Sequence, residues 1–349
     1  MSRSNLNRCG HEMHHLKATV ETIQWGAFDS STKPVLTVQS GDYIEIECLT
    51  HHAGDAVDFL MDEDVRQIYE AIPEEARGPG AHIVTGPIYV TDAEPGDALE
   101  CRVLQMRPRL KYGLNFVGRW GLLDKEFEGK EHVFVYEADV ESGVARAVFQ
   151  YAYDSPIRRV PGRITTVRAS DRKPALEGIR VPLRFHFGTA GVCPAGEGKI
   201  STIPPGNHGG NVDNREFVAG TSMFYPVHQK GALFWAGDTH FSQGDGEVNG
   251  TAIEGHINAT IQLVLHKGRH LKSPILETPE AWVTHGFNED LDEAVRGAVL
   301  EMIDVLHRKW NLSRLEAYSL CSVAGDLRVT QVVDGVKGAH MAIRRDLRS

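Results

Sequence analysis

The ionisable side chains of this chain gather most densely over residues 237–247, directly after a short apolar run. Asp238 and His240 stand two residues apart, so in an extended strand both project to the same side. A carboxylate oxygen and an imidazole nitrogen are both zinc ligands, and Asp245 and Glu247 repeat the spacing after a glycine. Such a group cannot be buried without pairing or a cation. For Asp238 and His240 the pattern therefore favours a divalent metal site, whereas for Asp245-Gly246 it favours the competing interpretation, a hairpin tip whose acids face water.

A second polar group lies upstream, over residues 204–215, which carry no continuous apolar pattern. The segment is therefore either exposed or lines a cavity, and its paired glycines allow the backbone to approach a ligand closely. His208 and Asp213 are candidate metal ligands, and Asn211 and Asn214 could donate to a substrate oxygen. The competing interpretation is a surface loop rich in Asn and Gly.

Four further places carry chemistry-bearing residue types. Glu254 follows the run 248–253, which we expect to be a strand, and could be an acid or base. His82 precedes a strand and is either a half-buried structural residue or a functional one. In residues 51–55 the two adjacent His side chains would point opposite ways in a strand, so at least one of them is expected to be structural. Cys193 would need a nearby base to act as a nucleophile, and a lone Cys is more often packing.

The elements that must position these residues are mostly strands. Apolar and charged residues alternate over 43–48 and again over 99–103, which is typical of half-buried strands. Each strand follows a Gly-Asp turn, at 41–42 and at 96–97, with a further strand before it. These repeated units predict a sandwich or barrel. The length suits one large domain over 1–349, with a candidate internal boundary in the polar, turn-rich stretch 142–180.

The C-terminal part predicts two helices and a closing hairpin. Asn311 is a stop signal for the first helix, and Ser313-x-x-Glu316 is a capping box that opens the second. Residues 329–333 and 340–343 read as the two strands of the hairpin. The fold class is thus mainly β, sandwich- or barrel-like, with a C-terminal helical pair. Five apolar residues at helical spacing predict the buried face of the first helix: Leu291, Val295, Val299, Met302 and Leu306.

Composition excludes several classes of protein. The chain has 349 residues with 37 Lys and Arg against 47 Asp and Glu, a net charge of −10. This acidity argues against a nucleic-acid partner, because phosphate binding needs concentrated Lys and Arg. No apolar run approaches the ~20 residues that span a bilayer, and the N-terminus lacks the apolar stretch of a secretory signal. The five Cys lie far apart without a CxxC pair, which favours a reducing cytoplasm.

The two polar blocks together resemble the acetamidase/formamidase family: PGNHGGNVDN at 205–214, followed by GDTHFSQGDGE at 237–247. Blocks at 93–97, 326–331 and 338–340 resemble the family as well, so the likeness extends over nearly the whole chain. The resemblance implies a β-rich, sandwich-like fold that hydrolyses short amides such as formamide and acetamide to a carboxylic acid and ammonia. It also implies a divalent metal, usually zinc, and a homo-oligomer.

The roles within that reaction follow from residue type. A metal polarises the amide carbonyl and makes hydroxide from water, while a carboxylate moves the proton to the leaving nitrogen. We expect Glu247, or failing it Glu254, to be the catalytic acid and base. The expected substrate-binding residues are Asn211, Asn214 and His82. The expected metal ligands are Asp213, Asp238 and His240, with His208 in reserve.

Residues 51–55 depart from the Gly-rich pattern of many members, and a polar pocket edge there would favour an amide with a polar substituent. Cys193 stands where other members often carry Ala, which argues against a Cys nucleophile. A Ser-based acyl-transfer site is disfavoured as well, because no Gly-x-Ser-x-Gly turn is present. The alternative function is a non-catalytic β-sandwich that binds a metal or a polar ligand through the same residues.

Overall fold

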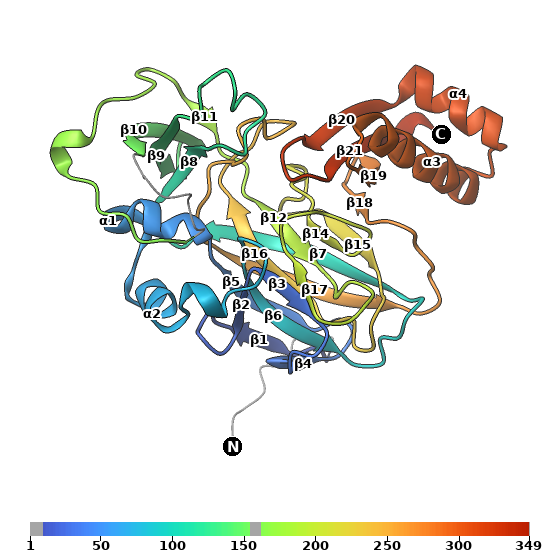
Figure 1. Ribbon diagram of the computed structural model, residues 1–349. Helices are drawn as coiled ribbons and strands as arrows, with labels where there is room; N and C mark the ends of the chain where they lie inside the picture. The colour runs from blue at the N-terminus through green and yellow to red at the C-terminus, as the bar shows by residue number, and fades with distance from the viewer. Residues whose placement is uncertain (1–9, 154–161, 349) are drawn as a thin grey trace.

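The computed structural model describes residues 10–153 and 162–348. Within this part of the chain the largest sheet has nine strands, which run through the middle of the molecule and out to the C-terminal helices (Figure 1). In spatial order they are β1 (Met13–Leu16), β5 (Tyr43–Cys48), β17 (Ile257–His266), β7 (Ala98–Pro108), β15 (Ser222–Pro226), β18 (Ile275–Glu277), β19 (Ala281–Asn288), β21 (Lys337–Arg344) and β20 (Asp326–Gln331).

A six-stranded sheet packs against the first part of this sheet. Its strands are β14 (Gly209–Asn211), β12 (His186–Gly191), β16 (Phe234–His240), β6 (Ile83–Val90) and β2 (Ile23–Trp25), with β4 (Leu36–Val38) parallel to β6. Two smaller sheets complete the β structure of the described residues. They contain β11 (Val181–Pro182), β10 (Val144–Tyr153), β9 (Glu131–Asp139) and β8 (Tyr112–Val117), and then β13 (Lys199–Ser201) with β3 (Ala27–Asp29).

Helices are few, which confirms the mainly β fold with a C-terminal helical pair. No helix in the described part of the chain has the length and apolar character needed to cross a membrane. The α-helices are α1 (Val57–Leu60), α2 (Glu63–Ala71), α3 (Leu291–Trp310) and α4 (Arg314–Ala324). Single 3₁₀ turns are η1 (His51–Asp55), η2 (Glu74–Ala76), η3 (Ala169–Asp171) and η4 (Arg345–Leu347).

The repeated Gly-Asp turns carry the chain from one sheet to the other. Asp42 Oδ2 accepts the backbone N–H of Gln39 at 2.8 Å, and Asp97 Oδ2 accepts that of Glu94 at 2.9 Å, so the two turns use the same contact. The first turn joins β4 of the six-stranded sheet to β5 of the nine-stranded sheet, and the second joins β6 to β7. Each turn therefore connects the two sheets, which pack face to face as the layers of a sandwich.

The main core fills the space between these sheets. Ile44, Leu99 and Ile261 of the nine-stranded sheet are wholly buried, as are Ile88 and Phe234 of the six-stranded sheet, and all belong to one apolar cluster. Burial of this apolar surface is the main force that holds the two sheets together. It also fixes where β6, β12, β14 and β16 end, and their ends carry the chemistry described below.

Helix α3 covers β19 and β21 with a face that includes the predicted Met302 and Leu306 but differs by one position in the first half of the helix. Ala294, Ala298 and Met302 are fully buried, whereas Val295 and Val299 lie at the edge of the contact. The reason is close packing: a Cβ on Gly286 of β19 would lie 2.0 Å from the carbonyl oxygen of Ala294. At so short a separation only small side chains fit between helix and sheet.

Two further expectations from the sequence can be compared with the structure. Residues 248–253 form a loop rather than a strand. The Asn249 side chain accepts the backbone N–H of Thr251, and the Asn115 side chain of β8 donates to the carbonyl of Thr251, so these groups are not free to pair with a neighbouring strand. Residues 181–187 belong to two strands, β11 and β12, which lie in different sheets. The candidate boundary 142–180 contains β10 and also residues 154–161, which lie outside the described residues. The single-domain organisation stays a prediction.

Candidate active site

Asp238 and His240 lie at the end of β16, whose residues are all buried. Asp238 has a φ of 47°, so the backbone leaves regular strand conformation at this residue. His240 Nε2 lies 3.7 Å from Asp238 Oδ2 and 3.3 Å from Glu254 Oε1, and the hydroxyl of Thr189 lies 3.1 Å from the same Asp238 oxygen. The predicted pair is thus brought together, but by a local backbone turn as well as by strand alternation.

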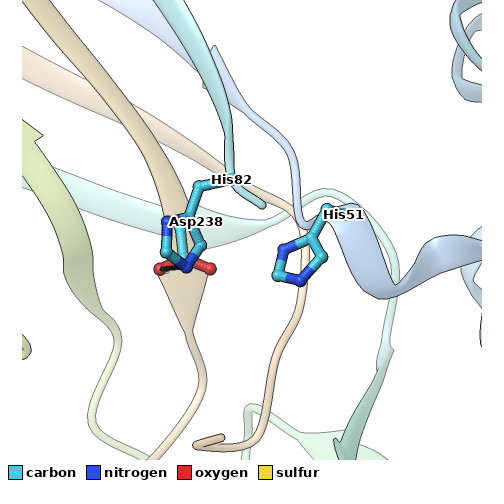
Figure 2. Close-up of side chains that lie close together, drawn as sticks. All are labelled: His51, His82 and Asp238. Atoms are coloured by element: carbon cyan, nitrogen blue, oxygen red, sulfur yellow. Dashed lines mark ion pairs between the residues drawn. The ribbon is translucent and has the colours of Figure 1, made fainter. Parts of the chain in front are cut away.

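Two histidines from other segments face the same carboxylate, as Figure 2 shows. His82 stands just before β6 and places its Nε2 3.7 Å from Asp238 Oδ2. His51 opens η1 and turns its ring toward the other two side chains (Figure 2). The potential ligand atoms of His51, His82 and Asp238 all lie within 4.8 Å of one another. Two imidazoles and a carboxylate form a donor set that suits zinc.

The stretch 51–55 is a 3₁₀ turn and not a strand. Thr50 caps it by accepting the backbone N–H of His52 at 3.1 Å. The rings of His51 and His52 have their centroids 4.1 Å apart, and both line the same pocket. The expectation that adjacent His side chains point opposite ways is therefore wrong, because it assumed extended backbone. His52 Nδ1 also contacts Asp55 Oδ2 at 2.8 Å, and this contact stabilises the turn.

Hydrogen bonds set which nitrogen of each ring faces the carboxylates. His82 Nδ1 lies 3.1 Å from the carbonyl oxygen of Thr202 and donates to it, so Nε2 is the ring nitrogen that faces Asp238. Gln243 donates its amide to the carbonyl of Asp213 at 2.7 Å, which turns its oxygen toward His240 Nδ1 at 3.0 Å. His240 therefore donates from Nδ1, and its Nε2 faces Asp238. This is the arrangement by which proteins orient metal-ligating histidines.

Four buried carboxyl groups beside these histidines have raised pKa values. Burial raises the pKa of Asp213 and of Glu247 well above the usual range, and each is raised further by neighbouring acids. Burial, and then the charge of Asp238, raises the pKa of Asp334 to about 8. Burial likewise raises the pKa of Glu254. Burial thus shifts all four groups toward their protonated forms relative to exposed carboxylates.

Asp238 and His240 behave in the opposite way. Burial alone would raise the pKa of Asp238, but the surrounding histidines, His82 first, bring it well below the usual range. Burial alone would lower the pKa of His240, but Glu254 and Asp238 raise it well above the usual range. Asp238 is therefore the ionised carboxylate of the site, and its neighbours are arranged around a negative charge.

Several polar atoms of the site are buried without partners. Among the described residues, Asp213 Oδ2 and Glu254 Oε2 have no hydrogen-bond partner. The same carboxylates belong to two further groups of potential ligands within 4.8 Å, Asp213–His240–Glu247 and Asp238–His240–Glu254. A buried carboxylate oxygen without a partner costs free energy unless a cation or a proton meets it. The arrangement is therefore suited to a positively charged ligand.

These side chains surround a pocket of about 400 Å³. Seven predicted site residues come together, because Asn211, Asp213, Asp238, Glu247, Glu254 and His82 line the pocket and His240 contacts its walls. Together the lining residues are His51, His52, Ala81, His82, Arg119, Trp120, Glu131, Ile203, Asn211, Asp213, Asp238, Glu247, Gly250, Thr251, Glu254, Val333 and Asp334.

The structure does not bring His208 or Asn214 to the pocket. His208 packs edge-on against Phe28, with ring centroids 5.4 Å apart, in the apolar cluster beneath β16. Asn214 turns its amide toward His285 at 2.8 Å and His340 at 3.0 Å, so its donors are used inside the protein. Both residues lie beside true pocket residues in the sequence, and the direction of their side chains separates them.

Two pocket residues have little or no signal in the sequence. His51 was recognisable as a ligand type, but its direction depended on the 3₁₀ turn. Asp334 lies in the turn between β20 and β21 and accepts the Asn211 amide through Oδ2 at 2.9 Å. An acid in a Gly-containing hairpin turn is usually a surface residue, so no local pattern marks Asp334 as part of a site.

Cys193 lies outside the pocket lining and packs in an apolar cluster with Phe28 and Trp235. Burial raises the pKa of its thiol to about 12. A thiol that holds its proton at neutral pH is a poor nucleophile. These observations agree with the sequence argument against a Cys acyl-enzyme.

Comparisons with known proteins point to one family. The sequence profile of the Acetamidase/Formamidase family matches residues 24–198 and 195–343. An acetamidase of Mycolicibacterium smegmatis is 28% identical over 364 residues, covering 88% of this chain and 85% of the relative. A formamidase of Methylophilus methylotrophus is 26% identical over 347 residues, covering 85% of this chain and 79% of the relative.

A solved structure agrees with these relatives. The crystal structure of a predicted acetamidase/formamidase from the thermophile Thermoanaerobacter tengcongensis superposes with a TM-score of 0.75 at 27% identity, over 97% of both chains. The fold, the blocks that surround the pocket and the match over nearly the whole chain all agree. The chain belongs to the acetamidase/formamidase family of amide-cleaving hydrolases.

Proposed function

We propose that this chain hydrolyses short aliphatic amides to a carboxylic acid and ammonia, with a divalent cation, zinc first, bound at Asp238. The observation that carries the proposal is the convergence of three groups of His and carboxylate side chains on one pocket, with Asp238 or His240 in every group. Named relatives that are acetamidases and formamidases support the reaction class.

The residues present fit a cation. His82 turns Nε2 toward Asp238, Asp238 is ionised, and His51 completes a set of two imidazoles and one carboxylate. We therefore propose His51, His82 and Asp238 as ligands. The sequence favoured Asp213 and His240 beside Asp238, and these two remain candidates through the neighbouring groups.

A divalent cation, when bound, polarises a carbonyl oxygen and lowers the pKa of water. The proton transfers belong to the protein. As a carboxylate, Glu247 can take a proton from the attacking water and then give that proton to the leaving amide nitrogen, and the pKa that burial and nearby acids raise makes it a stronger base than an exposed carboxylate. Glu254, which faces His240 at 3.3 Å, is the second candidate for this role.

Asn211 has a different role from the one the sequence favoured. Its amide nitrogen already donates to the carbonyl of Ile203 at 3.1 Å and to Asp334 Oδ2 at 2.9 Å. Both N–H groups are therefore used, and none is left for an oxyanion. We propose Asn211 as a residue that positions Asp334 at the pocket wall.

The direct test is an ammonia-release screen of small amides with metal analysis of the same sample. The proposal predicts release from at least one short amide and a divalent ion that is lost in His82→Ala. Ion loss in Asp213→Ala, with retention in His82→Ala, would return the ligand set to Asp213. A tightly held ion without ammonia from any amide would favour the non-catalytic alternative.

We also propose an oligomeric state and a cellular compartment for this chain. The family resemblance implies a homo-oligomer, which light scattering of the purified protein measures directly. The free, buried Cys48, Cys101, Cys193 and Cys321 suit a reducing cytoplasm. Localisation of a tagged chain by fractionation tests the second expectation.

A further inference from the structure

The pocket is much larger than a minimal amide. Acetamide has four non-hydrogen atoms, whereas a volume of about 400 Å³ lies in the range of pockets that enclose far larger ligands. A small ligand also gains only about 1.5 kcal/mol per non-hydrogen atom at best. Acetamide would therefore leave most of the wall uncontacted. The part of the wall away from the ionisable cluster indicates what fills the rest.

Trp120 is a preformed part of that wall. Its ring stacks on Phe116 with centroids 5.2 Å apart and an interplanar angle of 23°. Its Nε1–H donates to the carbonyl oxygen of Gly250 at 3.1 Å. A Cβ on Gly250 would lie 2.0 Å from Cδ1 of the indole, and a Cβ on Gly118 would lie 2.4 Å from the same ring system. Stacking, a hydrogen bond and two glycines thus hold the indole in one place.

The pocket lining also contains apolar side chains. Ala81, Ile203 and Val333 line the pocket with aliphatic groups. Thr251 also lines it, but its hydroxyl is engaged by the backbone N–H of Phe116 at 2.8 Å. Arg119 and Glu131 line the pocket as well, and they face each other with Arg119 Nε 4.0 Å from Glu131 Oε1. A ligand that fills the pocket therefore meets an indole and alkyl groups beside a charged pair. Such a surface binds flat or branched hydrocarbon.

We propose that the preferred substrate is an amide whose acyl part carries an aryl or branched alkyl group, and that this group packs on Trp120. The inference rests on the proposed function, because it assumes that the amide itself reacts beside Asp238. It makes Trp120 a specificity-determining residue. Residue types at the ionisable end select the amide, and Trp120 selects what the amide is attached to.

The experiment compares kcat/KM for acetamide, hydroxyacetamide and phenylacetamide in the wild-type protein and in variants at Trp120. The proposal predicts phenylacetamide to be preferred over acetamide by about tenfold to a hundredfold, the scale on which an apolar pocket discriminates. Trp120→Ala should lower that preference about tenfold or more, mainly through KM. Trp120→Phe keeps an aromatic ring and should restore most of it.

Phe127→Ala is the matched control, because Phe127 lies in the same segment as Trp120, is exposed and does not line the pocket. It should leave the preference unchanged. Circular dichroism and thermal melting establish that each variant is folded. Preference for acetamide, or for hydroxyacetamide as residues 51–55 suggest from sequence, would overturn the inference while leaving amide hydrolysis intact. Absence of hydrolysis with every amide would instead count against the proposed function.

Discussion

The pocket and the C-terminal unit of α3, α4, β19 and β21 differ in how far they satisfy local conformational preferences. In the C-terminal unit the helix ends are satisfied: Asp290 accepts the backbone N–H groups that open α3, and Ser313 and Glu316 form a capping box at α4. Asn311 ends α3 in the left-handed conformation that helix termini favour. The side chains that α3 and α4 bury form an apolar cluster, and the buried His285 and His340 of β19 and β21 lie against the amide of Asn214.

In the pocket, local preferences are overridden. Asp213, Asp238 and Glu247 have φ values of 54°, 47° and 43°, a region that side chains other than Gly seldom adopt. The same three residues are buried ionisable groups with displaced pKa values. Backbone strain and buried charge at one place cost stability that the rest of the fold must supply. The comparison teaches that regular local patterns mark the scaffold and that their violations mark the site.

The strongest way to break this comparison is Asp238→Ala. If Asp238 is the ionised centre of the pocket, the variant should lose more than about 10⁴-fold in kcat, on the scale of removing a residue that acts as a unit with others. It should also lose bound divalent metal, measured by elemental analysis after dialysis. Asp346→Ala is the control, because Asp346 is exposed and pairs with Arg344 far from the pocket. Full metal and full turnover in Asp238→Ala would contradict the assignment.

Glu247→Gln tests which carboxyl group of the pocket transfers the proton. The amide keeps the shape of the side chain and removes its proton transfer, so kcat should fall by ~10²–10⁴ with little change in metal content. Stopped or continuous ammonia assays measure the loss. Glu128→Gln, at an exposed residue paired with Lys130, should leave kcat unchanged. Unchanged turnover in Glu247→Gln would transfer the role to Glu254.

The pocket acids predict a pH dependence opposite in sign to that of the C-terminal unit, where burial lowers the pKa of His285 to about 4 and that of His340 to about 3. In the metal-free protein Asp334 keeps its proton up to about pH 8, whereas in the unfolded chain it ionises near its ordinary pKa of 3.8. Between these values the unfolded chain binds fewer protons than the folded one, so stability falls as pH rises, by about 1.4 kcal/mol per pH unit for one such group. The contribution is fully present below pH 4 and is lost by pH 8.

Denaturant unfolding of chelator-treated protein across this range measures the slope. Asp334→Asn should flatten it and raise stability near neutral pH, since the amide cannot ionise. The acids with raised pKa values beside it, Asp213 and Glu247, leave a residual slope of the same sign. The prediction is contradicted if the stability of the wild-type protein rises with pH, or if Asp334→Asn leaves the pH dependence of stability unchanged. Either result would show that these acids are ionised in the folded state.

The smallest expected effect concerns the scaffold. Ser313→Ala removes the side chain that caps α4 and should lower the free energy of unfolding by about 1 kcal/mol. Amide kcat/KM should stay at the wild-type value, because α4 has no residue in the pocket lining. Thermal melting and initial rates measure the two quantities on one preparation. A loss of activity without a loss of stability would mean that α4 acts on the pocket.

Much of the scaffold was predictable because its signals are local. Alternation over 43–48 identified β5, the Gly-Asp turns at 41–42 and 96–97 identified two inter-sheet units, and the capping box located α4. Each signal depends on residues within a few positions of one another. On α3 the apolar stripe identified the buried Met302 and Leu306 but not Ala294 and Ala298, because the close contact with Gly286 decides the packing in the first half of the helix.

By itself, the sequence determined the mainly β fold, the helical pair, the family and the residue types of the site. Only the tertiary structure decided which of those residues meet. His51, Asp238 and Asp334 come from a 3₁₀ turn, a central strand and a late hairpin turn, and they line one pocket because two sheets pack face to face. His208 and Asn214 are excluded by side-chain direction alone. Such contacts depend on long-range packing, and a pattern of neighbouring residues carries no record of it.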